Sequence, residues 1–535
     1  MQSQRQSWLP MVAISLSMVM MYITSFGVNV LINAIVNDLQ TTVVTLQSVI
    51  VSASFIAGSL MVTAGRLGDK FGKKRIFVLG VAIYTLGLTG VVLSPNTLAF
   101  SIAWGVIWPS GMVLIIPTSI ALIMHYYHGK QRAQAFGIYG AILSVVSALA
   151  PVLVGVLSDL INWRIALALS PIMGVATLLV SAKLPETNKD ARVEIDLLSV
   201  LLSVVSFGLF LYAVTLAGQY GWIFEKRPFA MMGMQWAVLG LSPVPFIYLA
   251  SFLLSLVFIY RGNQLKKQGR SPLLDSSLLL NIPFSIGMWI GALFFMVGAG
   301  FLFAYSVYLQ AGAEMSGLDT ALTTLPYAIT VAVVSFASPK LASKLAPKWI
   351  IIIGALVMIY GMYLTGQHAS LSMVPSDVLV AMTIVGIGAG LVMAQYTNVT
   401  MMSVKPEDSG AASGLSETMK EIVGQGFAVA FAGSILFSAV YASMTDSYAE
   451  KEGLTLESVE HSQIVVELED TFNTISPEEE AQFVASLPKN TREAYPQIVQ
   501  KAANDGLQIT LYFMMLAMLL VALMALAAPS QRVES

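Results

Sequence analysis

The sequence predicts an all-α protein that crosses a membrane fourteen times, and three observations carry this prediction. Of its 535 residues, 56% are hydrophobic and only 11% are charged, whereas a soluble protein carries about 25% charged residues. Apolar runs long enough to cross a bilayer recur along the chain. Clusters of lysine and arginine fall in every second loop between these runs. Lipid is therefore the expected solvent of the outer surface.

The apolar runs have the length of transmembrane helices, because a hydrocarbon core of about 30 Å takes roughly 20 residues. The first run is too long for the apolar region of a signal peptide and lacks a small-x-small cleavage site, so we expect it to remain as a helix. The predicted spans are 11–36, 43–64, 76–93, 98–123, 135–157, 165–182, 197–216, 245–260, 284–309, 321–337, 349–364, 378–402, 411–440 and 507–528.

Positive charge predicts the orientation, since short cytoplasmic loops retain lysine and arginine. Every basic cluster follows an even-numbered span, so both termini are expected to be cytoplasmic. The absence of a targeting extension fits the cytoplasmic (inner) membrane of a bacterium. The clusters contain Lys70, Lys73, Lys74 and Arg75; Lys130 and Arg132; Lys183, Lys189 and Arg192; Arg261, Lys266, Lys267 and Arg270; Lys340, Lys344 and Lys348; and Lys405.

A glycine-rich basic motif, GRLGDKFGKK, follows the second span at 65–74. Its glycines permit a tight turn and a close approach of helices, and its charges can pair with neighbouring helix ends. The motif resembles the signature loop of the major facilitator superfamily. That resemblance implies the major facilitator fold and a latch that holds two halves together in one state only. The expected latch residues are Gly65, Asp69, Lys70, Gly72, Lys73 and Lys74.

A degenerate copy of this motif follows the tenth span, at 339–348. An internal repeat is expected where two six-helix bundles move against each other, and an inserted helix pair would complete fourteen spans. Three positions match at a constant offset of 274 residues: Leu67 with Leu341, Lys70 with Lys344, and Lys74 with Lys348.

The chain is thus predicted to contain two six-helix bundles, an inserted pair and one large polar insert. The insert holds thirteen acidic and four basic residues and lies on the outer side by parity. Ser476-Pro477-Glu478-Glu479 has the pattern of a helix start, which predicts a small helical hairpin or cap and possible contact with an extracytoplasmic partner. A solvated acidic loop is the alternative. The predicted units are 1–185 (first bundle), 195–262 (inserted pair), 280–441 with 506–529 (second bundle) and 442–505 (insert).

Further local motifs resemble the fourteen-helix branch of the drug:proton antiporters. Individually they are weak, but they occur in the expected order and cover the chain except for the insert. The resemblance implies a secondary transporter that exports drugs in exchange for protons. The motifs are Asn162-Trp163-Arg164, LAGQYGW at 216–222, Tyr308-Leu309-Gln310, GIGAG at 386–390 and SGAASG at 409–414.

Departures from that branch put the usual coupling residues in doubt. Thr24 stands where the branch carries an acid in the first span, and Gly105 where it carries an arginine in the fourth. The antiporter motif of the fifth span is reduced to Pro151 and Gly155. Coupling to protons, if present, must use other residues.

A polar stripe in the first span supplies candidates for the substrate cavity. Ser25, Asn29, Asn33 and Asn37 are four residues apart and would share one helix face. Polar groups avoid lipid, so this face should line the interior or a water-filled cavity. Hydrogen bonding between helices without substrate contact is the alternative. The candidate cavity residues are Ser25, Asn29, Asn33, Gln310 and Gln395.

The thirteenth span carries Glu417, Lys420 and Glu421. At about 1.5 Å per residue, the two glutamates lie roughly 10 and 16 Å along the helix from its start. Ionisable groups at such depth are costly and are functional candidates. Lys420 can neutralise one glutamate and leave the other to carry a proton. A charge-compensated structural network is the alternative.

Other function classes are disfavoured by what the sequence lacks. It has no cysteine and only four scattered histidines, which argues against thiol chemistry and metal sites. It contains no phosphate-binding loop and no hydrolase or zinc-protease motif. We therefore expect no enzyme activity, no ATP-driven step, no cofactor, no metal and no nucleic-acid partner.

The predicted function is export of amphipathic or toxic small molecules by alternating access, in exchange for protons. The expected partners are the lipid bilayer, a small lipophilic or amphipathic substrate, and protons. Two alternatives remain open. One is a transporter of lipids or endogenous metabolites with weak or no proton coupling. The other is a non-transporting membrane sensor or scaffold, against which the intact latch motif argues.

Overall fold

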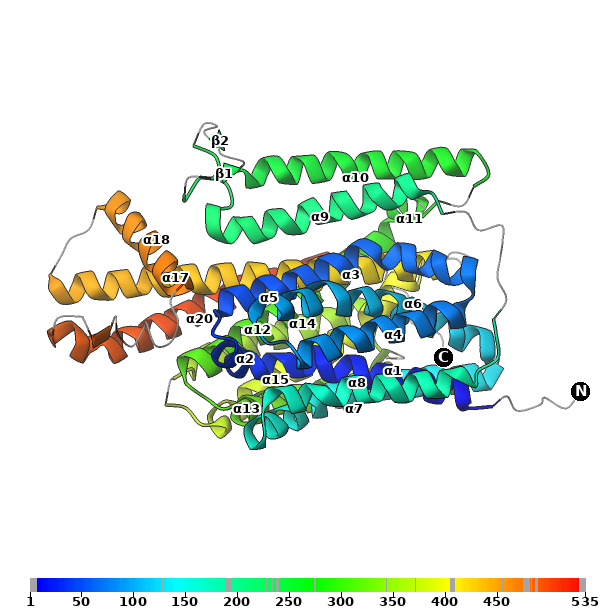
Figure 1. Cartoon of the computed structure of the whole chain (residues 1–535), viewed down its shortest axis with the longest axis horizontal. Helices are drawn as coiled ribbons and strands as arrows, with labels where there is room; N and C mark the ends of the chain where they lie inside the picture. The colour runs from blue at the N-terminus through cyan, green and yellow to red at the C-terminus, as the bar shows by residue number, and fades with distance from the viewer. Residues whose placement is uncertain are drawn as a thin grey trace, which may run out of the picture.

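The computed structural model is a bundle of long helices that run roughly side by side (Figure 1). It describes residues 7–528 except 128, 188–194, 228, 232–233, 237–239, 271, 274–275, 343, 371, 405–408, 454–456, 475–481, 483 and 486–488.

The first group of helices, which we call the N-terminal half, corresponds to spans one to six. Its first and fourth spans are interrupted, by a 3-10 segment (η1) and a π-helical segment (η2). The bounds are α1 Leu9–Gly27, η1 Val28–Leu31, α2 Ile32–Asp38, α3 Val43–Phe71, α4 Lys73–Val92, α5 Thr97–Ile102, η2 Ala103–Ile107, α6 Trp108–Tyr126, α7 Gly129–Leu160 and α8 Trp163–Ala182.

The second group, which we call the C-terminal half, corresponds to spans nine to fourteen and contains two further π-helical segments, η3 and η6. The bounds are α11 Ser277–Leu280, α12 Ile282–Val307, η3 Tyr308–Gly312, α13 Gly317–Ala342, α14 Pro347–Gln367, η4 Pro375–Val378, α15 Leu379–Met401, α16 Ser409–Glu421, η6 Ile422–Phe427, α17 Ala428–Glu452, α18 Ser458–Thr474 and α20 Lys489–Leu526.

Between the two halves, α9 (Leu197–Tyr220) and α10 (Val244–Lys267) pack on each other along one face of the bundle (Figure 1). Arg261 of α10 binds Asp196, which caps α9, at 3.0 and 3.2 Å. These hydrogen bonds lower the pKa of Asp196 to about 2, so the carboxylate stays ionised. A short two-stranded hairpin, β1 (Ala230–Met231) and β2 (Met234–Gln235), joins these helices within an otherwise helical fold.

Thirteen helices among the described residues are long and apolar enough to cross a membrane, and each matches one of the fourteen predicted spans. The remaining prediction, 135–157, falls on α7. That helix has 32 residues, but part of its side chains lies outside the described portion, and its described apolar stretch is Leu149–Leu160.

Short polar side chains set where several helices begin. Thr42, Asn96, Asn162 and Asn281 each accept a hydrogen bond from the backbone N–H three residues on, at the starts of α3, α5, α8 and α12. Gly72 ends α3 with a φ of 100°, a backbone conformation that favours glycine. The chain can therefore turn directly from α3 into α4.

The same glycine packing recurs in both halves. A Cβ added at Gly87 of α4 would lie 2.5 Å from the backbone of Trp108 on α6, and one at Gly361 of α14 would lie 2.5 Å from the backbone of Val385 on α15. Gly361 follows Gly87 by 274 residues, the offset of the repeated basic motif. Small residues permit such close helix contacts inside a membrane. The internal repeat is thus visible in packing as well as in sequence.

The polar insert is more helical than its predicted bounds suggest. α17 continues to Glu452, α18 packs against it, and α20 already begins at Lys489 (Figure 1). The boundary at 442 is therefore not a structural one, because α17 passes through it. The predicted helix start Ser476–Glu479 lies outside the described residues. We call the end of the bundle that carries this region the insert end, and the opposite end the Gly72 end.

The glycine contacts predict a stability test. Gly111→Val places a side chain within 2.3 Å of the Tyr84 backbone and should cost about 1–3 kcal/mol through overpacking. Gly65→Ala is the control, since a Cβ there meets nothing within 4 Å. Thermal unfolding in detergent should show a lower midpoint for Gly111→Val only. An equal loss in both variants would contradict this account of the packing.

Candidate functional site

The most unusual charges of the molecule lie at the end of α16. Lys420 Nζ lies 2.6 Å from Glu417 Oε1 and 3.3 Å from the hydroxyl of Tyr396 on α15. The same ammonium lies over the ring of Phe295 on α12, 4.7 Å from its centroid. A carboxylate and two aromatic rings therefore compensate a cation whose side chain is only 17% exposed.

Glu421, the other predicted coupling residue, is the last residue of α16 and is partly buried. Within the described part of the chain, its carboxylate has no hydrogen-bond or ion-pair partner, while Lys420 binds Glu417. The π-helical segment η6 starts directly after it, and π segments inside helices are frequent at functional sites. Lys420 thus forms its ion pair with Glu417 and not with Glu421, and the coupling role of these residues stays a prediction.

Two tyrosines from the N-terminal half complete the surroundings of Glu417. Tyr22 of α1 and Tyr139 of α7 lie close to each other, and both lie within range of the Glu417 charge. The group thus draws on five helices from both halves. We call it the central cluster: Tyr22, Tyr139, Phe295, Tyr396, Glu417, Lys420 and Glu421.

The four-residue spacing that relates Glu417 to Glu421 in α16 does not extend to Gln425. Gln425 lies within η6, where hydrogen bonds run from residue i to i+5, so the four-residue spacing no longer keeps it on the same face. Close packing accompanies this segment, since a Cβ at Gly424 would lie 2.7 Å from that of Phe295.

A change of helix type interrupts the polar stripe of the first span. The 3-10 segment η1 separates Ser25 on α1 from Asn33 on α2, and Asn29 lies within it. The segment η1 places backbone groups of the N-terminal half where they form hydrogen bonds with the C-terminal half; we call such an interaction between the halves a tie. Gln310 of η3 donates to the carbonyl of Asn29 and accepts from the backbone N–H of Asn33 at 3.1 Å.

Gln395, predicted for the cavity, is fully buried inside the C-terminal half. Its amide donates to Ser338 Oγ at 2.8 Å, and its carbonyl accepts from Asn398 at 3.0 Å. All three residues belong to α13 and α15. This arrangement corresponds to the alternative reading of polar residues in spans, a hydrogen bond between helices.

Two further ties join the halves at the insert end. Asp159 of α7 accepts a 2.9 Å hydrogen bond from the backbone N–H of Leu318, in the first turn of α13. Gly155, from the antiporter-motif remnant, makes the approach possible, because a Cβ there would lie 2.8 Å from the Gly317 carbonyl. Gln47 of α3 donates to the carbonyls of Val429 and Ala430 on α17. Pro151 lies in α7 one turn before Gly155.

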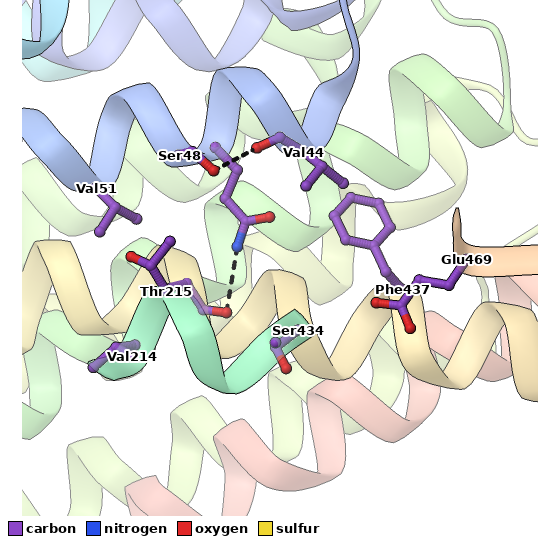
Figure 2. A pocket seen from close by; sticks show the side chains of 11 residues that line it. Val44, Ser48, Val51, Val214, Thr215, Ser434, Phe437 and Glu469 are labelled. Atoms are coloured by element: carbon purple, nitrogen blue, oxygen red, sulfur yellow. Dashed lines mark hydrogen bonds between the residues drawn. The ribbon is translucent and has the colours of Figure 1, made fainter. Parts of the chain in front are cut away.

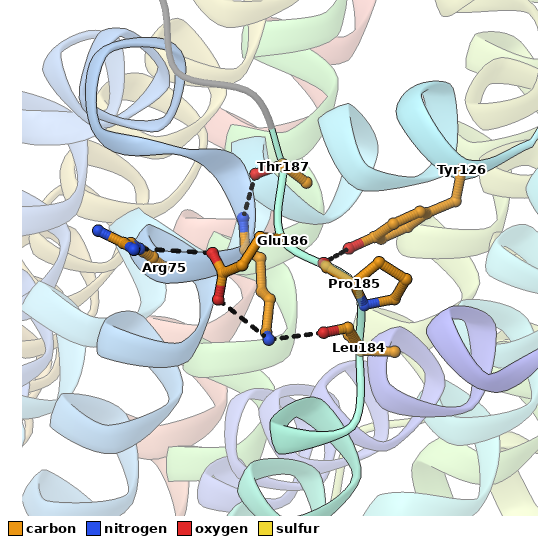
Figure 3. A network of polar contacts seen from close by, with 7 residues as sticks. Arg75, Tyr126, Leu184, Pro185, Glu186 and Thr187 are labelled. Atoms are coloured by element: carbon orange, nitrogen blue, oxygen red, sulfur yellow. Dashed lines mark hydrogen bonds and ion pairs between the residues drawn. The ribbon is translucent and has the colours of Figure 1, made fainter.

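The predicted latch residues lie at the Gly72 end, and Figure 3 shows the polar contacts of Leu184, Pro185, Glu186 and Thr187, which follow α8 there. Lys74 Nζ donates to the Leu184 carbonyl at 2.6 Å and to Glu186 at 3.2 Å, and Arg75 also contacts Glu186. These hydrogen bonds, with Lys74 first, lower the pKa of the Glu186 carboxyl. The contacts stay within the N-terminal half and join α4 to the chain after α8.

Other residues of the latch motif make contacts outside this network. Arg66, inside the motif, reaches out of the N-terminal half and donates to the Pro272 carbonyl at 2.6 Å. Lys70 lies over the ring of Phe71. The side chain of Asp69 lies outside the described part of the structure.

The structure explains both departures in the first and fourth spans. Thr24 is fully buried, and its hydroxyl lies 2.9 Å from that of Ser170 on α8. A Cβ at Gly105 would lie 2.6 Å from Ser52 Oγ on α3. Thr24 is therefore part of a hydrogen bond between α1 and α8, and a side chain at Gly105 would meet α3.

Comparisons with known proteins agree on one family. Residues 14–429 match the model of the Major Facilitator Superfamily. Multidrug resistance protein Stp of Mycobacterium tuberculosis is 26% identical over 445 residues, which cover 82% of this chain and 78% of the relative. Multidrug efflux pump LfrA of Mycolicibacterium smegmatis is 24% identical over 463 residues, covering 85% and 86%.

One solved structure of the same fold is a bacterial homologue of the human lysosomal transporter Spinster in an inward-facing, occupied conformation. It is 15% identical, covers 98% of both chains and has a TM-score of 0.61. At this identity the likeness concerns the fold alone.

The ties at the insert end predict a conformational shift. Gln310→Leu removes two hydrogen bonds between the halves, each worth about 0.5–1.5 kcal/mol, and should raise the population open at this end about tenfold. Spin labels at Asn37→Cys and Ala311→Cys would report it, since the chain has no native cysteine. Gln395→Leu, which removes two hydrogen bonds within one half, should leave the distance unchanged. A matching shift in both variants would refute the tie.

Proposed function

This chain belongs to the Major Facilitator Superfamily and is a secondary transporter, and we propose that it exports amphipathic small molecules from the cytoplasm in exchange for protons. In this proposal fourteen helices cross the cytoplasmic membrane as two six-helix bundles and an inserted pair. Both termini lie on the cytoplasmic side. The single observation that supports proton exchange best is the uncompensated carboxylate of Glu421 beside the Glu417–Lys420 pair.

The orientation follows from charge. The basic residues of the latch motif and of the loop after α10 lie at the Gly72 end, whereas thirteen acidic residues lie in the insert. Short basic loops are retained in the cytoplasm, so the Gly72 end is assigned to the cytoplasm and the insert end to the outside. The three ties then close the outer side, so in this proposal the substrate reaches the central cluster from the cytoplasm.

Proton exchange can proceed through Glu421 because its neighbours leave it uncompensated. Lys420 is already bound to Glu417, so a deprotonated Glu421 leaves one net negative charge in a low-dielectric region. That charge can be removed by a proton or by a cationic substrate, but not by both together. Competition between the two for one carboxylate is sufficient for exchange.

The aromatic residues of the central cluster suit an amphipathic substrate. Tyr22, Tyr139, Phe295 and Tyr396 surround the charges with ring faces and hydroxyls. Aromatic rings bind apolar groups because the contact buries apolar surface, and they bind cations because the face of the ring carries partial negative charge. The multidrug relatives named above support the same substrate class, while the lost acid at Thr24 keeps a weakly coupled transporter of lipids or metabolites as the second candidate.

The proposal predicts that Glu421→Gln abolishes coupling. In proteoliposomes with a pH gradient, a lipophilic cation should collapse the gradient for the wild type and at least tenfold more slowly for Glu421→Gln, because a glutamine cannot exchange a proton. Glu467→Gln, an exposed acid of α18, is the control and should behave as wild type. Substrate-driven proton movement that persists in Glu421→Gln would exclude this residue. Uptake of the cation without any proton movement in the wild type would favour the second candidate.

A further inference from the structure

A small cavity lined by both polar and apolar side chains lies at the insert end, beside the inserted pair. It measures about 40 Å³, enough for two or three water molecules. Four helices line it: α3, α9, α17 and α18 (Figure 2). The lining residues that carry polar side chains are Gln47, Ser48, Thr215, Ser434 and Glu469.

The cavity lies on the seam between the two halves. α3 belongs to the N-terminal half and α17 to the C-terminal half, and α9 packs on both. The hydrogen bonds from Gln47 to the Val429 and Ala430 carbonyls cross this seam beside the cavity. Gly433 allows the contact, because a Cβ there would lie 2.4 Å from the Gln47 amide. Any opening of the outer side that parts α3 from α17 must therefore widen this cavity.

Glu469 fills the end of the cavity that faces the insert. It comes from α18 and points in beside Phe437 (Figure 2), and only 5% of its surface is exposed. A carboxylate buried this far is costly without a partner. Arg227, from the loop between α9 and α10, lies 3.4 Å away with its own side chain 17% exposed. The pair joins the insert to the inserted helices across the mouth of the cavity.

Neighbouring contacts hold this arrangement in place. Lys226 donates to Ser438 of α17 at 3.0 Å, and Phe472 of α18 stacks on Tyr441 of α17. The loop of the inserted pair and α18 are thus both fastened to the outer part of α17. These contacts fix the helix that carries Glu469, so the position of its side chain at the cavity is defined by packing.

We propose that this cavity is the closed outer vestibule of the transport path and that Glu469 is its plug. The proposal rests on the export function and orientation given above. When α3 and α17 part, the vestibule joins the central path, Glu469 leaves Arg227, and an amphipathic molecule exits past the amide and hydroxyl groups of Gln47 and Ser434. The insert thereby acts on the outer gate, a role that its acidity alone does not suggest.

Cysteine accessibility tests the plug without any transport measurement. Ser434→Cys introduces a unique thiol into the cavity of a chain that has no other cysteine. A membrane-impermeant maleimide, added from outside to oriented vesicles without substrate or gradient, should label it slowly. Adding Glu469→Ala should raise the labelling rate at least tenfold, because the mouth loses both the side chain and the ion pair with Arg227. Glu467→Ala, on the exposed face of the same helix, should leave the rate unchanged.

Two further arms keep the test decisive if Glu469→Ala folds poorly. Glu469→Gln preserves the shape and removes the charge, and it should also accelerate labelling. A lipophilic cation that drives turnover should accelerate labelling of Ser434→Cys with Glu469 intact. Unchanged labelling in both Glu469 variants overturns the plug, and turnover without faster labelling overturns the vestibule. Neither readout depends on protons, so a failure of proton exchange through Glu421 would appear separately.

Discussion

The contact between Lys420 and Glu417 is the interaction on which the rest of the central site depends. An ammonium in the middle of a membrane protein must be neutralised, and here a carboxylate at 2.6 Å, a hydroxyl and two rings share that task. Lys420 makes its ion pair with Glu417, whereas Glu421 has no ion-pair partner within the described part of the chain. The proposed exchange rests on this difference, because a proton and a cationic amphiphile can both neutralise the Glu421 carboxylate.

Alternating access requires two stiff bodies and a seam that can break, and the packing provides both. Gly87 in the N-terminal half and Gly361 in the C-terminal half, 274 residues later, each bring two helix backbones into close contact. Such close packing makes the helices of one half move as a unit. Across the seam, the ties are a few hydrogen bonds of Gln310, Asp159 and Gln47, each of modest strength. Such bonds can be exchanged for bonds to water when the outer side opens.

The sequence predicts the spans well because the bilayer sets the length of an apolar run, and it predicts Glu417, Lys420 and Glu421 because charge in such a run is rare. It fails where helix geometry departs from the α form. The segments η1 and η6 interrupt the α-helical geometry at Asn29 and after Glu421, and no composition marks a 3-10 or π turn. Hydropathy likewise marks the end of the apolar stretch and not the end of the helix. The predicted boundary at 442 therefore falls inside α17, which continues to Glu452. Tyr22 could have been predicted from the sequence, because it lies three residues before Ser25 on the same helix face. Tyr139 and Phe295 could not, because they belong to distant helices that come together only in the folded protein.

The inserted helix pair and the insert are joined through the loop between α9 and α10. α9 covers the seam between α3 and α17, the place where parting helices would otherwise admit lipid into a polar path. Its loop is fastened to α17 through Lys226 and to α18 through Arg227. α9 packs on helices of both halves, but its loop is fastened to the C-terminal half alone, so this cover can stay over the seam while the N-terminal half moves beneath it. On this view the extra helices do not bind substrate themselves. They keep the outer part of the path separate from the bilayer, and the buried Glu469–Arg227 pair links that cover to the insert outside.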